Sequence, residues 1–431
     1  MSDMEMFSVL QIFKPLAQQL GCYEVRPSPK PTLVNDIHPL FALDRWVKGY
    51  DQHTSEFYWK MESALRLASL ILTEDSTLPW FIHLRYGSQQ VEDKGIVLAW
   101  THEFFTPTQG RVVRDSLERM AQSTSIMFVP RKYKETELGK AYGCTGCYKD
   151  DLPWFEEFRP SDWPRIGGQF KDSEQSNRGF PVICLNAVFQ DGFKAFDNKT
   201  QSERYRFSFM FVATLLHEVA HAYWFYLGRY STENFLNCEP YWTARDKRNE
   251  LGSSFETIIF GRIVDPLGSI EGLRWSEMLI SLQSETFAHP EDRSRVLKKL
   301  FDNRSANFIE INVPPSTSDI SFAGWRGNAW FHPDGTRLGP YVVSIVHVVP
   351  MWWIHQWFNH NAWEQRRKMW REHGVYQPPG LGPTIVVLCQ RNTGVQQPFL
   401  MYCTNIDVDP NLEATAVHTE KVGLYQFQVP R

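Results

Sequence analysis

The stretch Thr214-Leu215-Leu216-His217-Glu218-Val219-Ala220-His221-Ala222-Tyr223 carries the strongest chemical signal in the chain. It lies within a helical pattern that we expect to run from about Glu203 to Leu227, with Gly228 as its C-cap. His217 and His221 are four residues apart, so both project from one helix face, about one turn apart. Two neutral imidazoles in this arrangement can bind one metal ion. Glu218 points about 100° away around the helix, where it can reach a metal-bound water as a general base.

This motif resembles that of the HExxH zinc metallopeptidases, the zincins, and the close resemblance covers about residues 182–260. One zincin branch adds a third His three residues after a Gly. That branch does not fit, because Trp224 and Leu227 occupy those positions. The resemblance therefore implies the gluzincin branch, in which a Glu on a later helix is the third ligand. It also implies Zn²⁺ as the cofactor.

Four glutamates follow the motif within reach: Glu233, Glu239, Glu250 and Glu256. Glu250 begins a segment, Glu250-Leu251-Gly252-Ser253-Ser254, that resembles with Asn249 the Asn-Glu-x-x-Ser-Asp stretch of thermolysin-like enzymes. The resemblance implies Glu250 as the third ligand, with Glu256 as the runner-up. Ser254 replaces an Asp that orients a ligand histidine in those enzymes.

A second helix is expected from about Asp246 to Arg262, and it would contain Gly252. A glycine inside a helix costs about 1 kcal/mol relative to alanine. A close approach of two helices beside the metal would explain why this position is a glycine.

The implied chemistry is hydrolysis in which zinc polarises a carbonyl and Glu218 takes a proton from the zinc-bound water. The resemblance also implies a downstream His or Tyr that stabilises the oxyanion. The candidates are Tyr341 and His347, with His332 as a further one. The apolar run from Val182 to Phe189 is expected to be a strand, and the resemblance implies that it is the sheet edge above the zinc.

Composition limits the class of protein. The chain has 431 residues, of which 42% are hydrophobic and 22% charged, so it is globular and has about two or three domains. The net charge of −4 disfavours a nucleic-acid-binding protein. We find no secretory signal and no apolar run of membrane-spanning length. Seven cysteines, an odd and sparse set, predict a cytoplasmic protein with reduced thiols, and Cys144 and Cys147 are read as two loop thiols.

The predicted fold class is α+β, a mainly helical zincin-like metallohydrolase core with a small mixed β-sheet and additional helices. The predicted organisation has four parts: an extended N-terminal arm at 1–45, an α+β part at 46–180 with a long loop at 130–180, the catalytic core at 181–265, and a mainly helical part with a short β tail at 266–431. Helical patterns are expected through 273–302 and from Met351 to His373, and a strand from Leu78 to Tyr86.

The sequence therefore predicts a zinc-dependent hydrolase, similar to a metallopeptidase, that cleaves an amide or ester bond in a short peptide or small molecule. One alternative is a zinc enzyme of small-molecule biosynthesis that catalyses a cyclisation or isomerisation. The other is a non-catalytic binding protein on the same scaffold. No nucleic-acid or membrane partner is expected, and the sequence leaves the oligomeric state open.

Overall fold

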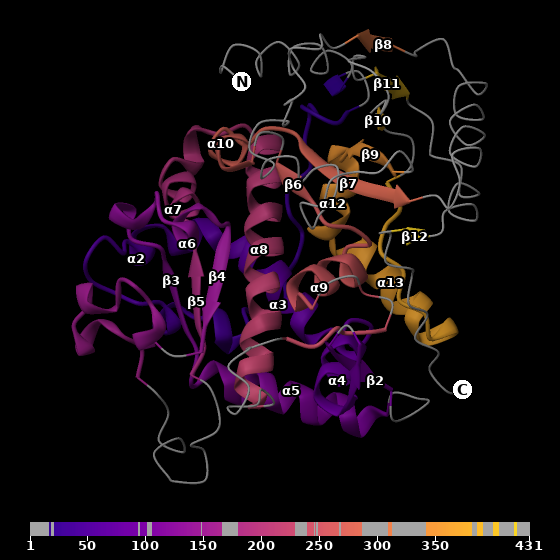
Figure 1. Ribbon diagram of the computed structural model, residues 1–431. Helices are drawn as coiled ribbons and strands as arrows, with labels where there is room; N and C mark the ends of the chain where they lie inside the picture. Colours follow the sequence, from indigo (N-terminus) through magenta and orange to yellow (C-terminus); the bar gives the residue numbers. More distant parts are fainter. Residues whose placement is uncertain are drawn as a thin grey trace.

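The computed structural model has the α+β architecture expected from the sequence, with one long helix at its centre (Figure 1). The residues that the structure describes are 17–18, 21–93, 95–100, 106–147, 149–165, 180–228, 239–244, 246, 249–266, 269–286, 309–312, 342–381, 386–390, 400–404 and 418–419. Among these residues, none of the helices combines the length and the hydrophobicity that a membrane span requires.

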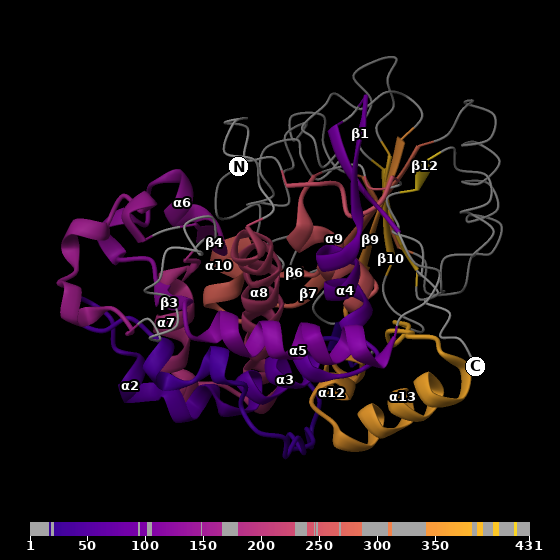
Figure 2. The same cartoon turned by 90° about the horizontal axis from the view of Figure 1, so that it is seen from below.

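The central helix is α8, Gln201–Leu227, close to the predicted bounds. Thr200 begins it with a capping box to Glu203, and Gly228 ends it in the left-handed conformation at φ 61°. Most of its residues are buried, on all sides, so α8 is a core helix rather than an amphipathic surface helix. It contacts α3, α4, α5, α9, α12, β4 and β5, and the view from below shows α3 and α5 beneath it (Figure 2).

A three-stranded mixed sheet lies against α8. Its order is β3-β5-β4, with β3 (Ser125–Phe128) parallel and β4 (Gly143–Gly146) antiparallel to the central strand β5 (Val182–Leu185). The expectation that Val182–Phe189 is an edge strand is therefore wrong. The strand stops at Leu185, Asn186 caps helix α7 (Ala187–Lys194), and every residue of β5 is buried.

The edge of this sheet is β4, which lies in the segment predicted to be a long loop. Its sequence, Gly-Cys-Thr-Gly, is short and has a single β-branched residue, Thr145, with a glycine at each end, so it does not identify a strand. Pairing with β5 makes it one, so tertiary contact overrides weak local preference. The helix α6 (Glu137–Lys140) precedes it.

The N-terminal part supplies helices that cover α8. They are α3 (Glu62–Thr73), α4 (Leu78–Tyr86) and α5 (Pro107–Ala121), whereas α2 (Thr54–Phe57) contacts α7. The strands β1 (Ser88–Glu92) and β2 (Gly95–Ala99) form a hairpin. The segment Leu78–Tyr86 was predicted to be a strand and is a helix. Its residues are buried on all sides, so their hydrophobicity shows no period that could separate a helix from a strand.

The C-terminal part differs from the mainly helical expectation. Within the described residues of this part, seven strands form an antiparallel sheet of order β12-β7-β9-β10-β11-β8, with β6 paired to β7. The strands are β6 (Asp265–Pro266), β7 (Leu279–Thr286), β8 (Ile309–Asn312), β9 (Val342–Val348), β10 (Val386–Gln390), β11 (Leu400–Thr404) and β12 (His418–Thr419). Residues 279–286, predicted to be helical, pair along β9, and this long-range pairing decides their conformation.

Two helices stand where one was expected near the C-terminal sheet. They are α12 (Met351–Trp357) and α13 (His360–His373), and α10 (Ser269–Arg274) lies earlier in the chain. The break occurs because Asn359 takes an extended conformation and its side chain caps α13 at Ala362. Gly374 ends α13, as predicted.

The N-terminal arm packs along the helical core, and short 3-10 turns lie between the longer elements. The arm follows α12 and α8, since Thr32 donates to the carbonyl of Phe358 and the Tyr205 hydroxyl donates to that of Pro29. The 3-10 turns are Pro39–Phe41, Leu43–Arg45, Tyr58–Met61, Arg131–Tyr133, Lys149–Asp151, Phe155–Glu157, Pro160–Asp162 and Phe196–Asn198.

Candidate metal centre

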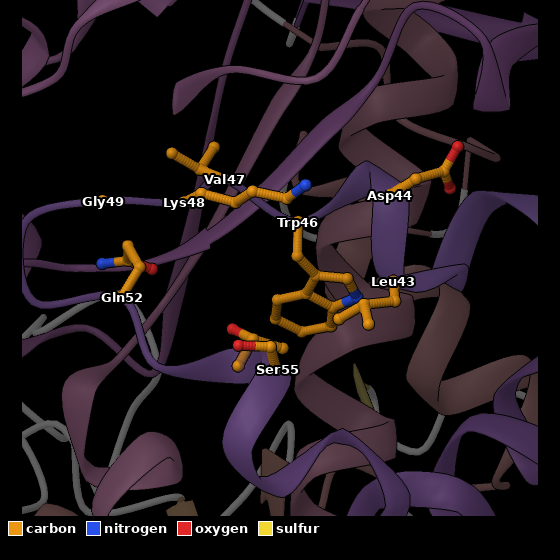
Figure 3. Close-up of a pocket in the computed structure, with 9 residues that line it drawn as sticks. Leu43, Asp44, Trp46, Val47, Lys48, Gly49, Gln52 and Ser55 are labelled. Carbon is orange, nitrogen blue, oxygen red and sulfur yellow. The ribbon is translucent and has the colours of Figure 1, made fainter. Parts of the chain in front are cut away.

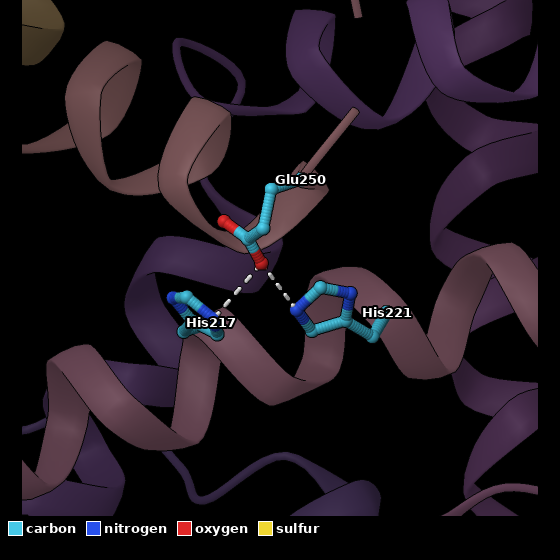
Figure 4. Close-up of side chains that lie close together, drawn as sticks. All are labelled: His217, His221 and Glu250. Atoms are coloured by element: carbon cyan, nitrogen blue, oxygen red, sulfur yellow. Dashed lines mark ion pairs between the residues drawn. The ribbon is translucent and has the colours of Figure 1, made fainter. Parts of the chain in front are cut away.

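The two histidines of the motif lie side by side on α8, with ring centroids 5.0 Å apart. Figure 4 shows both rings turned toward the carboxylate of Glu250, which comes from the start of a separate helix. The Glu250 Oε1 atom is 3.2 Å from His217 Nε2 and 2.8 Å from His221 Nε2. The structure thus brings the predicted third ligand to the same side of both histidines.

Glu250 reaches this position because it is the N-cap of α9 and not a residue within a helix. The helix α9 runs from Leu251 to Ile259, shorter than the predicted Asp246–Arg262. Glu250 has an extended backbone, φ −130° and ψ 100°, and its Oε2 accepts a hydrogen bond from Ser253 N–H. One carboxylate oxygen therefore caps the helix, and the other is left for the histidines.

Two further carboxylates hold the opposite nitrogen of each ring. Glu256 Oε1 is 2.7 Å from His217 Nδ1, and Glu239 Oε1 is 2.5 Å from His221 Nδ1. A carboxylate on Nδ1 fixes the tautomer with its hydrogen on that atom, so the lone pair lies on Nε2. Glu256, the predicted runner-up ligand, is therefore an orienting group for His217 in this geometry.

Ser254 does not orient either histidine. Its hydroxyl donates a hydrogen bond of 2.9 Å to Asp246.

Glu218 is buried beside the centre and is held by the edge strand. The Thr145 hydroxyl on β4 lies 2.8 Å from Glu218 Oε2 and 3.1 Å from the Glu218 carbonyl oxygen. A Cβ atom on Gly143 would lie 2.6 Å from Glu218 Oε1, so only glycine leaves room for this carboxylate. Thr145 was not among the predicted site residues, because nothing in a short polar segment marks it as a partner of a residue 73 positions away.

The donor set fits zinc. His217, His221 and Glu250 are the one group of potential ligands within the described residues whose ligand atoms all lie within 4.8 Å of one another. Two ligands of a tetrahedral zinc site are about 3.3 Å apart, close to the 3.2 Å and 2.8 Å found here. The side chains of these residues are 24%, 14% and 30% exposed, so a fourth position can open to water or substrate.

Charge makes the centre attractive to a cation. Burial by itself would lower the pKa of both imidazoles, but Glu250 and Glu256 raise the pKa of His217 well above its usual value. Glu239 and Glu250 likewise raise the pKa of His221 to about 10. Burial raises the pKa of Glu250, and the two imidazoles outweigh it and hold that pKa well below its usual value. Without a metal, protons on the imidazoles therefore balance the carboxylates, and a divalent cation would replace those protons.

The raised imidazole pKa values give a pH dependence that differs between the zinc-free and the zinc-loaded protein. A group whose pKa rises on folding contributes stability that is complete below its unfolded pKa, about 6.5, and disappears as the pH rises through its folded pKa. For His221 this range extends to about 10. We expect the thermal midpoint of the zinc-free protein to fall between pH 6.5 and 10 relative to that of the zinc-loaded protein. Differential scanning fluorimetry with and without chelator measures this, and identical pH slopes would contradict it.

Gly252 lies on α9 directly against the His217 ring of α8. A Cβ atom at this position would lie 2.3–2.4 Å from the His217 ring, which accounts for a glycine inside the helix. The two helices pack together through this contact.

We therefore expect Gly252→Ala to destabilise the protein by about 1–3 kcal/mol and to displace His217, through overpacking. An alanine inside a helix otherwise stabilises it by about 1 kcal/mol, so the sign of the effect is diagnostic. Chemical denaturation measures the change in the free energy of unfolding, and the zinc content reports the displacement of His217. Gly380→Ala, outside any helix, is the control for adding a methyl group without a clash, because nothing lies within 4 Å of its added Cβ. Equal stability of Gly252→Ala and the wild type would show that the helices can separate without cost.

The remaining predicted site residues lie elsewhere. Tyr341, His332 and Glu233 lie outside the described residues. His347 is on β9, in register with Ser281 of β7 and Val386 of β10, and is not one of the three clustered ligands. The oxyanion-stabilising role of Tyr341 and His347 stays a prediction.

A cavity of about 540 Å³ lies apart from the metal centre. Figure 3 shows Trp46 and Lys48 among its lining residues. Trp46 pairs with Ile126 of β3, so this cavity adjoins the strand at the opposite side of the sheet from β4. It is therefore a separate feature from the centre built by α8 and α9.

Comparisons with protein-family models, with curated proteins and with solved structures found no match to this chain.

Proposed function

We propose that the chain is a zinc-dependent hydrolase, similar to a metallopeptidase, that cleaves an amide or ester bond in a short peptide or small molecule. One observation carries this proposal. The Nε2 atoms of His217 and His221 converge with Glu250 Oε1, and the buried carboxylate of Glu218 lies on the same helix beside them. A purely structural contact between α8 and its neighbours would not need two imidazoles and the carboxylates of Glu218, Glu239, Glu250 and Glu256 at one place.

Each residue of the centre has a separate role in the proposed hydrolysis. Zinc, when bound, supplies a Lewis acid and lowers the pKa of bound water to about 7. His217, His221 and Glu250 would hold it, and Glu218 would accept the proton of the attacking water and pass it to the leaving group. Burial raises the pKa of Glu218, which helps this carboxylate to keep the proton until the leaving group takes it. Thr145 holds Glu218 Oε2, so Oε1 is available for the water.

The edge strand β4 suggests how the substrate is bound. In the described part of the sheet β4 pairs only with β5, so its other edge can pair with an extended chain. Thr145 lies on this strand and contacts Glu218. A peptide paired along β4 would therefore pass beside the general base, and this favours a peptide over a compact small molecule.

The cytoplasm remains the proposed location. Cys144 and Cys184 are opposite each other on neighbouring strands, and both are thiols rather than a disulfide. Cysteines that stay reduced are typical of a reducing compartment.

Two measurements on the purified protein test the proposal. Elemental analysis should find one zinc per chain after zinc is supplied, and a library of short peptides should contain substrates whose turnover stops with a chelator and returns with zinc. Bound zinc without hydrolysis of any peptide or ester would favour the small-molecule cyclase or isomerase. A well-folded protein that takes up no zinc would favour a binding protein and overturn the proposal.

A further inference from the structure

The carboxylate of Glu239 lies between the metal centre and the start of α9. Its Oε1 is 2.5 Å from His221 Nδ1, and its Oε2 accepts a hydrogen bond of 3.0 Å from Leu251 N–H. The side chain is only 10% exposed. The two oxygens of one largely covered carboxylate thus join two elements that are separate in the sequence.

Each contact meets a distinct physical need. Because His221 donates its Nδ1 hydrogen to Glu239, Nε2 is the ring atom that faces Glu250 and the candidate metal position, and its lone pair becomes available to a metal when the Nε2 proton leaves. Leu251 N–H is one of the first amides of α9, which have no partner within the helix. A negative charge at this end of a helix is favourable. Glu250 accepts a hydrogen bond from Ser253 N–H, so the carboxylates of Glu239 and Glu250 together cap the first turn of α9.

These contacts form a closed ring. It runs from His221 to Glu239, from Glu239 to Leu251 N–H, along the chain to Glu250, and back to His221 Nε2. The position of Glu250 therefore depends on the same carboxylate that orients His221.

Glu256 offers a contrast within the same helix. It contacts His217 Nδ1 at 2.7 Å, and its other partner is the backbone of Val264, beyond the end of α9. Glu256 therefore orients one ligand without holding the start of the helix.

We propose that Glu239 is the positioning residue that couples metal binding to the docking of the first turn of α9. This inference rests on the proposed zinc site but not on the reaction performed there. A carboxylate is required, because both groups that it contacts are donors. A glutamine has a single acceptor oxygen, so it can serve either His221 or Leu251 N–H. If its amide faces His221, it also favours the tautomer with the hydrogen on Nε2, which cannot bind a metal.

The experiment compares Glu239→Gln and Glu239→Ala with Glu256→Gln as the control. Zinc affinity is measured by competition with a chromogenic chelator, and hydrogen exchange of a peptide covering residues 249–255 is measured with and without zinc. We expect both Glu239 variants to lose about 10–100-fold in zinc affinity. Glu239→Ala should also exchange faster at the start of α9, while Glu256→Gln loses zinc affinity with exchange in that turn unchanged.

Two outcomes would overturn the inference: wild-type zinc affinity in Glu239→Ala, or the same change of exchange in Glu239→Ala and Glu256→Gln. If the wild-type protein binds no zinc, the proposed function fails by itself. The exchange measurement on zinc-free protein still tests whether Glu239 holds α9.

Discussion

Replacing Glu218 with glutamine should lower the turnover number of the hydrolase by about 10²–10⁴-fold and leave zinc bound, because only the proton transfer is removed. Glutamine has the same size as glutamate, and Glu218 is buried between Thr145 and Gly143, so a larger or smaller residue would disturb the strand. The amide cannot accept the proton of the water. Single-turnover kinetics and elemental analysis measure the two quantities on one preparation.

Thr145→Ser is a matched control for this experiment, since it keeps the hydroxyl that holds Glu218. We expect it to retain most of the activity. A Glu218→Gln variant as active as the wild type would remove the general base from the proposal. A variant that is inactive because it has lost its zinc would show that Glu218 acts on the structure of the centre.

Replacing Glu250 should lower zinc affinity by more than about 100-fold, more than the loss expected for a residue that only orients a ligand. The proposed assignment gives Glu250 the third coordinating oxygen, whereas Glu256 contacts His217 on the nitrogen away from the centre. Since Glu250 also caps α9, an alanine would remove the cap as well, at a cost of about 0.5–2 kcal/mol. Glu250→Asp keeps a capping carboxylate but is one methylene too short to reach both Nε2 atoms.

The informative comparison is therefore Glu250→Asp against Glu256→Gln, with zinc affinity and helical circular dichroism measured for both. We expect the first variant to lose the zinc and keep its helical signal, and the second to lose only about 10–100-fold in affinity. The reverse order would assign the third ligand to Glu256.

The secondary structure near the motif illustrates how far local sequence information reaches. The bounds of α8 follow from the Thr200 capping box, the apolar pattern and Gly228, which all lie within the helix or next to it. The helix α9 starts later than predicted because Asn249-Glu250-Leu251 is equally compatible with a helix, and the extended conformation at Glu250 goes with its capping of Ser253 N–H and its contacts with the histidines. Strands β4 and β7 were missed for the same reason, since each is made by its partner strand.

The sequence by itself determined the positions of His217, Glu218 and His221 relative to one another, because a helix places residues four apart on one face whatever surrounds it. It also indicated the close approach at Gly252, because a buried helical glycine has a cost that calls for a packing reason. Tertiary structure alone decided that Glu239 and Glu256 hold the outer nitrogens and that Thr145 holds Glu218. Those contacts join residues 18 to 73 positions apart, and no periodicity or local preference acts over such separations.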